Sequence, residues 1–367
     1  MIKRVLIIGG YGNFGSFITE TLAKESNIQV IIAGRTLCKA KKLALRIESK
    51  HPAEYVEIDI NQLTTNSLVA INPDIVIHTS GPFQSQSYDV AELCINQGCH
   101  YIDLADGRDF VNNIKTLDTI AKEHSSLVIS GASSVPCLTS AIVDHYQSEF
   151  LQLEELDYGI TTAQKTARGL ATTAAILGYT GKPFETLIQN KPTRIYGWQD
   201  LRVRKYKDLG WRLLGNCDIP DLSLFPERYK DIQTIRFYAG LEIPFIHITL
   251  WSLSWLVRFK IIRNLQKYAA LMLKASFWFD CLGSSNSAFH MQLSGKDKSG
   301  QTKKITFELT ARSGDGPFIP CMPAILIAKK IANQEMTTIG AHPCMDFITL
   351  DEYLDGLKEM DISWEVK

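Results

Sequence analysis

The fold is decided by the stretch VLIIGGYGNFG, residues 5–15, near the start of the sequence. Residues 5–8 form a continuous apolar run, as expected for a strand buried on both faces of a parallel sheet. The pattern Gly-x-Gly-x-x-Gly follows at 10–15, and residues 14–23 have the apolar spacing of a helix. This order of strand, glycine-rich turn and helix is the context that a dinucleotide-binding motif requires.

Each glycine of the motif has its own expected role. Gly10 would allow the tight turn, Gly12 would let the backbone approach a pyrophosphate, and Gly15 would let helix and strand pack closely. The N–H groups at the start of the helix, from Asn13 and Phe14, would then face the phosphates. A glycine-rich turn that binds no ligand is the alternative.

Strand-like and helix-like segments alternate over the first 145 residues, which predicts an α/β Rossmann fold, a doubly wound parallel sheet. Beyond residue 150, strand patterns at 193–196 and 234–238 and a hairpin pattern at 288–310 favour a second, α+β domain. We expect a Rossmann domain over 1–148 and a substrate or dimerisation domain over 149–312. Residues 313–367 are expected to form helices that return to the Rossmann domain.

Composition excludes several classes of protein. The 367 residues are 45% hydrophobic and 21% charged, as in a globular protein, and Lys+Arg equals Asp+Glu at 39 each. This neutrality argues against a nucleic-acid partner. The eight cysteines form no Cys-x-x-Cys pair, so we expect no metal. The first residues lack the length and cleavage site of a signal peptide, which favours a cytoplasmic protein.

The end of the second strand bears on the choice of cofactor. Arg35 lies 20 residues after Gly15, where NAD enzymes usually carry an acid for the ribose 2′-hydroxyl. Gly34, Arg35 and Thr36 therefore favour NADP, because a guanidinium binds a 2′-phosphate that an acid would repel. A surface arginine is the alternative. Asp59, at the end of the third expected strand, either accepts from the adenine amino group or caps a turn.

Two later strand ends supply further candidates. Ser80, Gly81, Pro82 and Phe83 follow the fourth strand, and in open α/β sheets ligands bind outside the carboxyl ends of the strands. We expect this loop to line the ribose and nicotinamide. Tyr101 and Asp103 end the next strand, so either could act as a catalytic acid or base. The alternative is that both are structural.

Several short segments resemble the saccharopine dehydrogenase-like family of NADP-binding oxidoreductases. The resemblance is strong over 1–145 and weaker over 286–345. Its segments are Ala33-Gly-Arg-Thr36, Gly81-Pro-Phe83, Ala91-Glu-Leu-Cys94, Gly98-Cys-His-Tyr-Ile-Asp-Leu104 and Ser313-Gly-Asp-Gly-Pro317. It implies a Rossmann domain with NADP and an α+β domain that holds the substrate and often a dimer contact. The saccharopine reductases carry Asp-Pro-Gly where this chain has Val135-Pro136-Cys137, which argues against saccharopine as the substrate.

One stretch is unusually apolar. Residues 243–257 contain two tryptophans and several leucines, and Arg258, Lys260 and Arg263 follow them. The stretch is about 15 residues long and includes His247, Thr249, Ser252 and Ser254, so it is too short for a membrane span, which needs about 20 apolar residues. A buried helix pair or a dimer face is one interpretation. A membrane-surface element over 243–263, or an apolar wall for the substrate, is the other.

We therefore expect an NADP-dependent oxidoreductase that transfers a hydride to or from a C=N, C=O or C=C bond of a small molecule. The alternatives are a reductase of a lipid-like substrate at a membrane surface and a non-catalytic NADPH-binding sensor or interaction protein. The candidate catalytic residues are Tyr101 and Asp103. The candidate cofactor-binding residues are Gly10, Tyr11, Gly12, Asn13, Phe14, Gly15, Gly34, Arg35, Thr36, Asp59, Ser80, Gly81, Pro82 and Phe83.

Overall fold

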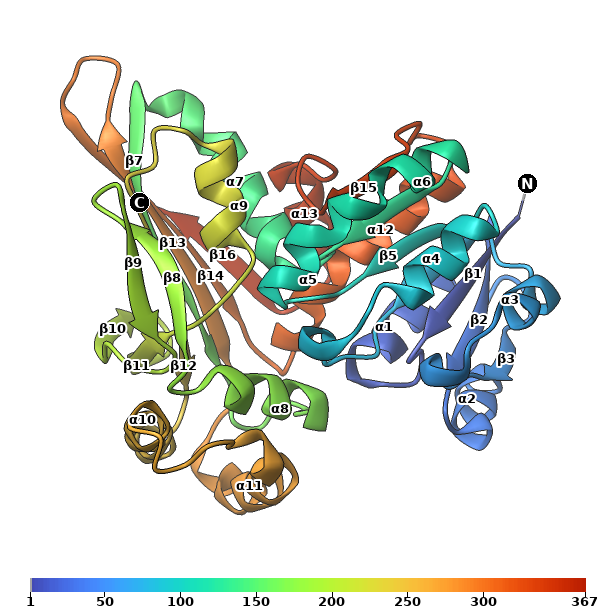
Figure 1. Ribbon diagram of the computed structural model, residues 1–367, viewed down its shortest axis with the longest axis horizontal. Helices are drawn as coiled ribbons and strands as arrows, with labels where there is room; N and C mark the ends of the chain where they lie inside the picture. Colours follow the sequence, from blue (N-terminus) through green and yellow to red (C-terminus); the bar gives the residue numbers. More distant parts are fainter. Residues whose placement is uncertain (1) are drawn as a thin grey trace. The chain divides into compact units, whose positions relative to one another are not determined.

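A computed structural model describes residues 2–367, which divide into two compact units (Figure 1). The first unit comprises Met1–Ala141 and Phe318–Gly356, and the second comprises Ile142–Pro317 and Leu357–Lys367. The chain therefore passes from one unit to the other three times. Residues 318–356 return to the first unit, whereas the last eleven residues, 357–367, belong to the second and not to the Rossmann domain as the sequence analysis expected.

The first unit is built on a seven-stranded sheet in the order β15-β6-β5-β4-β1-β2-β3, in which every pair is parallel. Residues 5–8 of the central β1 are fully buried, in keeping with their apolar run. This is the predicted Rossmann-like α/β fold. The strands are β1 (Lys3–Ile8), β2 (Ile28–Gly34), β3 (Glu54–Glu57), β4 (Ile75–His78), β5 (His100–Asp103), β6 (Leu127–Ser130) and β15 (Gly340–Pro343).

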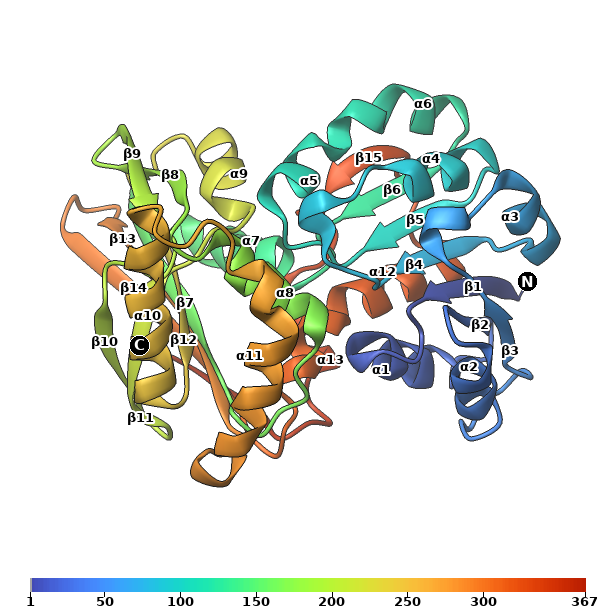
Figure 2. The same ribbon diagram turned by 60° about the horizontal axis from the view of Figure 1, so that its bottom comes forward.

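Helices cover both faces of this sheet (Figure 2). Ile31 packs with α3 and α4 on one face, while Ile32, its neighbour in β2, packs with α2 on the other, as the alternation of side chains in a strand requires. The helices are α1 (Asn13–Leu22), α2 (Leu37–Ala44), α3 (Thr65–Ile71), α4 (Asp89–Asn96), α5 (Arg108–Asn112), α6 (Asp118–Glu123), α12 (Met322–Ala332) and α13 (Leu350–Gly356). Helix α7 (Thr139–Tyr146) spans the boundary between the units.

The second unit contains a mixed seven-stranded sheet in the order β10-β11-β12-β7-β13-β14-β16. Its central strands carry an apolar face, on which Tyr158 of β7 lies between Phe237 of β12 and Met291 of β13. The strands are β7 (Gln152–Thr162), β10 (Arg202–Tyr206), β11 (Gly210–Asn216), β12 (Thr234–Leu241), β13 (Ser287–Lys296), β14 (Thr302–Ala311) and β16 (Ile362–Val366). A separate hairpin joins β8 (Pro183–Ile188) and β9 (Lys191–Tyr196).

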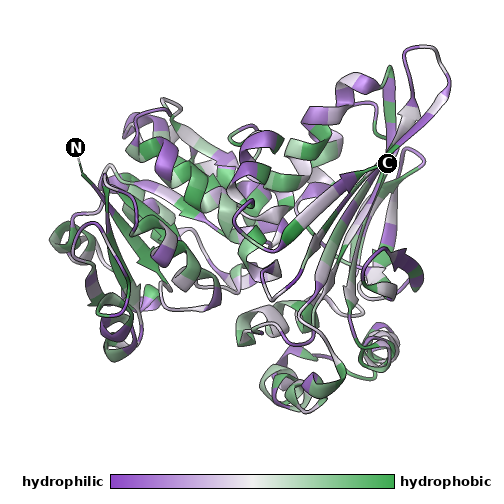
Figure 3. Cartoon of the chain, turned by 180° about the vertical axis from the view of Figure 1, so that it is seen from behind, coloured by the Kyte–Doolittle hydropathy of each residue, from purple (hydrophilic) through white to green (hydrophobic). Residues whose placement is uncertain are grey.

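Four helices complete the second unit: α8 (Leu170–Tyr179), α9 (Asp221–Arg228), α10 (Pro244–Arg258) and α11 (Ala269–Ser276). Helix α10 begins with a proline, which suits the first turn because its missing N–H has no partner there in any case. Much of α10 and α11 is coloured as hydrophobic in Figure 3. Among residues 2–367, none of the helices combines the length and the apolar character that crossing a membrane requires.

Two sequence expectations need correction. The third strand ends at Glu57 rather than at residue 60, so Asp59 lies beyond it and caps the short 3-10 helix η1 (Ile60–Gln62). The C-terminal segment is not purely helical, because it adds β15 to the first sheet and β16 to the second. Both strands are short and follow turns, so their apolar pattern is too brief to predict a strand.

Candidate functional site

The glycine-rich turn joins β1 to α1, and its tightest position is Gly9 rather than Gly10. Gly9 has a φ of +80°, a conformation that strongly favours glycine, and an added Cβ would lie 2.6 Å from Thr79 Oγ1. The tight turn expected of Gly10 therefore belongs to its neighbour. Gly10 is constrained differently, since a Cβ there would lie 2.8 Å from the Ile7 carbonyl oxygen. A Cβ on Gly15 would collide with the Gly9 carbonyl, so helix and strand pack closely at Gly15.

The N-terminus of α1 is uncapped in the described part of the chain. Gly12 is its N-cap residue and provides no side-chain oxygen, and the first bond of the helix runs from the Ser16 N–H to the Gly12 carbonyl at 2.9 Å. The N–H groups of Asn13, Phe14 and Gly15 therefore remain as donors at the positive end of the helix dipole. Such a terminus favours an anion, and above all a phosphate.

Tyr11 connects this turn to the next one along the sheet. Its hydroxyl accepts a hydrogen bond of 2.9 Å from the backbone N–H of Thr36, the N-cap residue of α2. Its ring lies so close to Gly34 that a Cβ there would be 2.5 Å from it. Arg35, between these contacts, is exposed, and no carboxylate of residues 2–367 pairs with it. The only cation in this turn thus stays available to a ligand.

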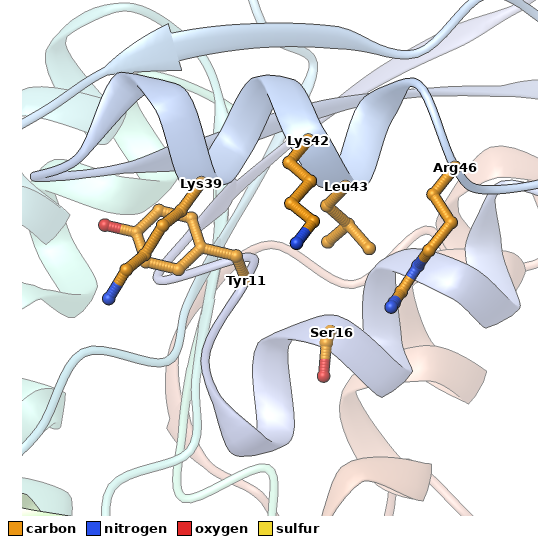
Figure 4. Close-up of a pocket in the computed structure, with 6 residues that line it drawn as sticks. All are labelled: Tyr11, Ser16, Lys39, Lys42, Leu43 and Arg46. Carbon is orange, nitrogen blue, oxygen red and sulfur yellow. The ribbon is translucent and has the colours of Figure 1, made fainter.

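A pocket of about 290 Å³ opens beside this turn, between α1 and α2 (Figure 4). Three of its lining side chains are cationic, and only Arg46 has an ion-pair partner, Glu20 at 2.7 Å. Lys41, in contrast, lies 6.0 Å from the ring of Tyr55 and does not line the pocket. The lining residues are Tyr11, Ser16, Lys39, Lys42, Leu43 and Arg46. The pocket is therefore suited to an anionic group.

The remaining cofactor candidates are Asp59 and the residues of the loop after β4. Asp59 Oδ1 accepts two hydrogen bonds of 3.0 Å, from the backbone N–H and from the side-chain amide of Asn61. These bonds match the alternative in which Asp59 caps a turn. Phe83 is only 4% exposed and packs against the rings of His78 and Phe110, so its side chain does not line the crevice as expected. Ser80, Gly81 and Pro82 are partly exposed after the carboxyl end of β4, and their cofactor contact stays a prediction.

Tyr101 and Asp103 lie at the carboxyl end of β5 but are only 1% and 0% exposed. The Tyr101 hydroxyl lies 3.0 Å from His78 Nδ1. Asp103 Oδ1 accepts three hydrogen bonds of 2.9 Å, from the backbone N–H groups of Ala105 and Gly131 and from the Ser130 hydroxyl. Burial raises the pKa of Asp103 to about 6 and lowers the pKa of His78 to about 4. A catalytic role for the pair stays a prediction, and this geometry favours the structural alternative.

Three prolyl-cysteine segments of the sequence converge in the first unit. Cys137 and Cys344 hydrogen bond to each other, and both they and Cys321 lie near Tyr353. All three are buried, and burial raises the pKa of the Cys321 and Cys344 thiols, so these remain protonated and unreactive. Within residues 2–367, no three His, Cys, Asp or Glu side chains are grouped as metal ligands.

Sequence reasoning missed several residues of this region. Gly9 directly precedes the counted motif, and only its φ distinguishes it from Gly10. The pocket residue Ser16 lies on α1 and Arg46 lies in the turn that follows α2, and no spacing rule links them. His78 ends β4 two residues before Ser80, where the loop that the sequence singled out begins, so its place at a strand end could have identified it.

A parallel sheet wound on both sides, with a glycine turn leading into an uncapped helix and a cation after β2, defines a Rossmann-type dinucleotide-binding protein. Comparison with protein families agrees, because residues 5–129 match the model of the saccharopine dehydrogenase NADP binding domain. Residues 5–129 are therefore similar to the NADP-binding domain of the saccharopine dehydrogenase family.

Solved structures extend the likeness to the whole chain. Saccharopine dehydrogenase (L-Glu forming) from Saccharomyces cerevisiae superimposes with a TM-score of 0.70 at 12% identity, covering 100% of both chains. Amine dehydrogenase from Mycobacterium smegmatis gives a TM-score of 0.48 at 9% identity over 95% of each chain. Dihydrodipicolinate reductase from Paenisporosarcina gives 0.42 at 12% identity, over 94% of this chain and 98% of the other. No curated protein matches the sequence.

Proposed function

We propose that this chain is an NADP(H)-dependent oxidoreductase that transfers a hydride to or from a C=N, C=O or C=C bond of a small molecule. The observation that carries the proposal is the exposed, unpaired guanidinium of Arg35 beside the glycine turn, in residues 2–367. An acid at this place would bind the 2′-hydroxyl of NAD and repel a 2′-phosphate, whereas a guanidinium binds a phosphate through charge-assisted hydrogen bonds.

In this proposal the chain's own groups bind and orient the cofactor. The uncapped N–H groups at the start of α1 hold the pyrophosphate, and Arg35 with Lys39, four residues on, holds the 2′-phosphate. The bound nicotinamide supplies or accepts the hydride. Asp103 is a positioning residue, because its three hydrogen bonds hold the backbone after β5 and after β6 at the edge where the ligand binds.

The substrate differs from saccharopine in this proposal. Val135 is partly exposed and carries no charge at the place where the saccharopine reductases that the sequence resembles have an acid. A substrate with fewer charged groups suits such a lining, because an uncompensated charge is costly to bury.

The experiment is a titration of the purified protein with NADPH and with NADH, followed by nicotinamide fluorescence, for the wild type and for Arg35→Ala. We expect tighter binding of NADPH, and in the variant a loss on the order of tenfold or more for NADPH alone. Lys24→Ala is the matched control, since Lys24 is also exposed in the first unit and lies outside the pocket.

Equal affinity for both cofactors, unchanged by Arg35→Ala, would refute the NADP assignment. A subsequent screen of imino acids, ketones and enoyl thioesters with NADPH tests the reaction itself. Tight binding without turnover of any of them would favour the alternative, an NADPH-binding sensor.

A further inference from the structure

Helix α10 of the second unit has an inverted distribution of side chains. Its buried side carries His247 and Ser254 along with Leu250, and the His247 ring packs edge-on against Trp198. Its exposed side carries the large apolar side chains Phe245, Ile248 and Leu256, continued by Phe259, with the smaller Thr249 and Ser252 between them. A helix at a water-facing surface normally shows the opposite pattern. The outer side of α10 is therefore unsuited to water.

Helix α11 and the 3-10 turn η7 (Phe277–Leu282) continue this apolar surface. Leu271 and Trp278 are exposed, and 75% of the surface of Trp278 is accessible. Their spacing of three and four residues from Lys274 places all three along one side of this helical segment. Phe245 of α10 and Phe279 of η7 are in contact, with ring centroids 4.9 Å apart, and α10 and α11 run side by side in Figures 1 and 2. The two helices thus present one continuous surface, here called the α10–α11 surface.

This surface is also cationic. Lys260, Arg263, Lys267 and Lys274 are exposed, and among residues 2–367 none of them has an ion-pair partner. Residues 243–282 contain a single acid, Asp280, which is already bound by Arg168 at 2.5 Å and by Gln164 at 3.0 Å. The surface therefore carries uncompensated positive charge between its apolar side chains.

We propose that the α10–α11 surface docks on an anionic phospholipid bilayer. Apolar and aromatic side chains enter the interfacial region, while lysine and arginine heads reach the phosphates on flexible stems. A second copy of the chain is a poorer occupant, because its identical surface would bring four more unpaired cations against these four with no free carboxylate to meet them. The proposal does not rest on the proposed function.

The test is co-sedimentation of the full chain with vesicles of phosphatidylcholine alone and of phosphatidylcholine with phosphatidylserine. We expect binding to the phosphatidylserine vesicles only, and weaker binding as salt is raised. Reversing the four surface cations (Lys260→Glu, Arg263→Glu, Lys267→Glu, Lys274→Glu) should weaken binding on the order of 100-fold. Phe259→Ser with Trp278→Ser should weaken it on the order of tenfold.

A control with the same change of net charge separates this surface from general electrostatics. It reverses four exposed lysines elsewhere in the second unit, namely Lys191, Lys230, Lys298 and Lys304. Unchanged thermal unfolding would verify that each variant is folded. The proposal is overturned if the wild type ignores phosphatidylserine vesicles at low salt, or if the control loses binding as strongly as the surface variant. It is also overturned if sedimentation reveals a dimer that Phe259→Ser with Trp278→Ser dissociates while vesicles bind neither protein.

Discussion

Helices α1 and α10 differ in how their sequences relate to what they bury. Helix α1 buries Ile18 and Leu22 and leaves Glu20 facing outward, as its amphipathic pattern predicts. Helix α10 buries a histidine and a serine and exposes Phe245 and Ile248. The role that we propose for α1 depends on its N-terminus, whereas the role that we propose for α10 depends on a whole side of the helix. Apolar composition alone therefore does not tell a core helix from a docking helix.

The largest expected effect is that acid lowers the free energy of unfolding more in the second unit than in the first. Burial lowers the pKa of His247 and His290 in the second unit, and of His78 in the first, to about 4. The unfolded state therefore binds protons first as pH falls from 6.5 to 4, so each histidine costs up to about 3 kcal/mol of stability. In the first unit burial also lowers the pKa of His100, but Asp103 opposes the loss of stability, because its raised pKa makes the folded state take up a proton near pH 6.

The second unit should consequently open before the first as pH falls from 7 to 4.5. Hydrogen exchange followed on peptides of each unit would measure this order. His247→Gln should reduce the difference between the pH values at which the two units open. It removes one of the two histidines of the second unit, His247 and His290, whose pKa values are lowered by burial. Earlier opening of the first unit would contradict the pKa directions given above.

A smaller effect separates the two sides of α10. Leu250→Ala should lower the free energy of unfolding by about 3 kcal/mol, since the side chain is buried and its removal leaves a cavity. Leu256→Ala, on the exposed side of the same helix, should change it by less than about 0.5 kcal/mol. Urea unfolding of both variants measures the difference. Equal losses would mean that another molecule covers Leu256 in solution.

The N-terminus of α1 can be tested through its packing. Gly15→Val should weaken NADPH binding by at least about 100-fold, because the side chain would push the helix away from the turn. Gly178→Ala, where an added Cβ meets only Gln266 at 3.9 Å, should leave the affinity unchanged. Fluorescence titration of both variants checks this. Normal affinity in Gly15→Val would remove the glycine turn from the binding site.

The smallest effect concerns the pocket beside α1. Lys42→Ala should weaken NADPH binding about threefold, since this lysine lines the pocket, whereas Lys41→Ala on the opposite side of α2 should have no effect. The difference should shrink as salt is raised, because both lysines are exposed. Identical affinities at low salt would place the cofactor's phosphates away from the pocket.

The first sheet was largely predictable because its elements are periodic and its turns are marked by glycine. Sequence could not settle the roles of Tyr101 and Asp103, because a strand end lies at the boundary between core and crevice, and only the fold decides which side a residue faces. Which of Lys41 and Lys42 lines the pocket depends on the rotation of about 100° around the axis of α2 that separates neighbouring residues. A run of basic residues in the sequence does not reveal which of them faces the pocket. The orientation of α10 was hidden for a different reason, since both of its sides carry apolar residues and both carry polar ones.

The discontinuous first unit has a consequence for synthesis. Its seventh strand, β15, and the helix α12 that covers one sheet face are translated after the entire second unit has begun to form, and β16, the edge strand of the second sheet, comes last of all. On the ribosome the two sheets cannot be completed until residues 340–343 and 362–366 have left the exit tunnel. The glycine motif therefore leaves the ribosome while its own domain is still incomplete. During that interval a nascent-chain chaperone or the dinucleotide would be the first molecule to bind it.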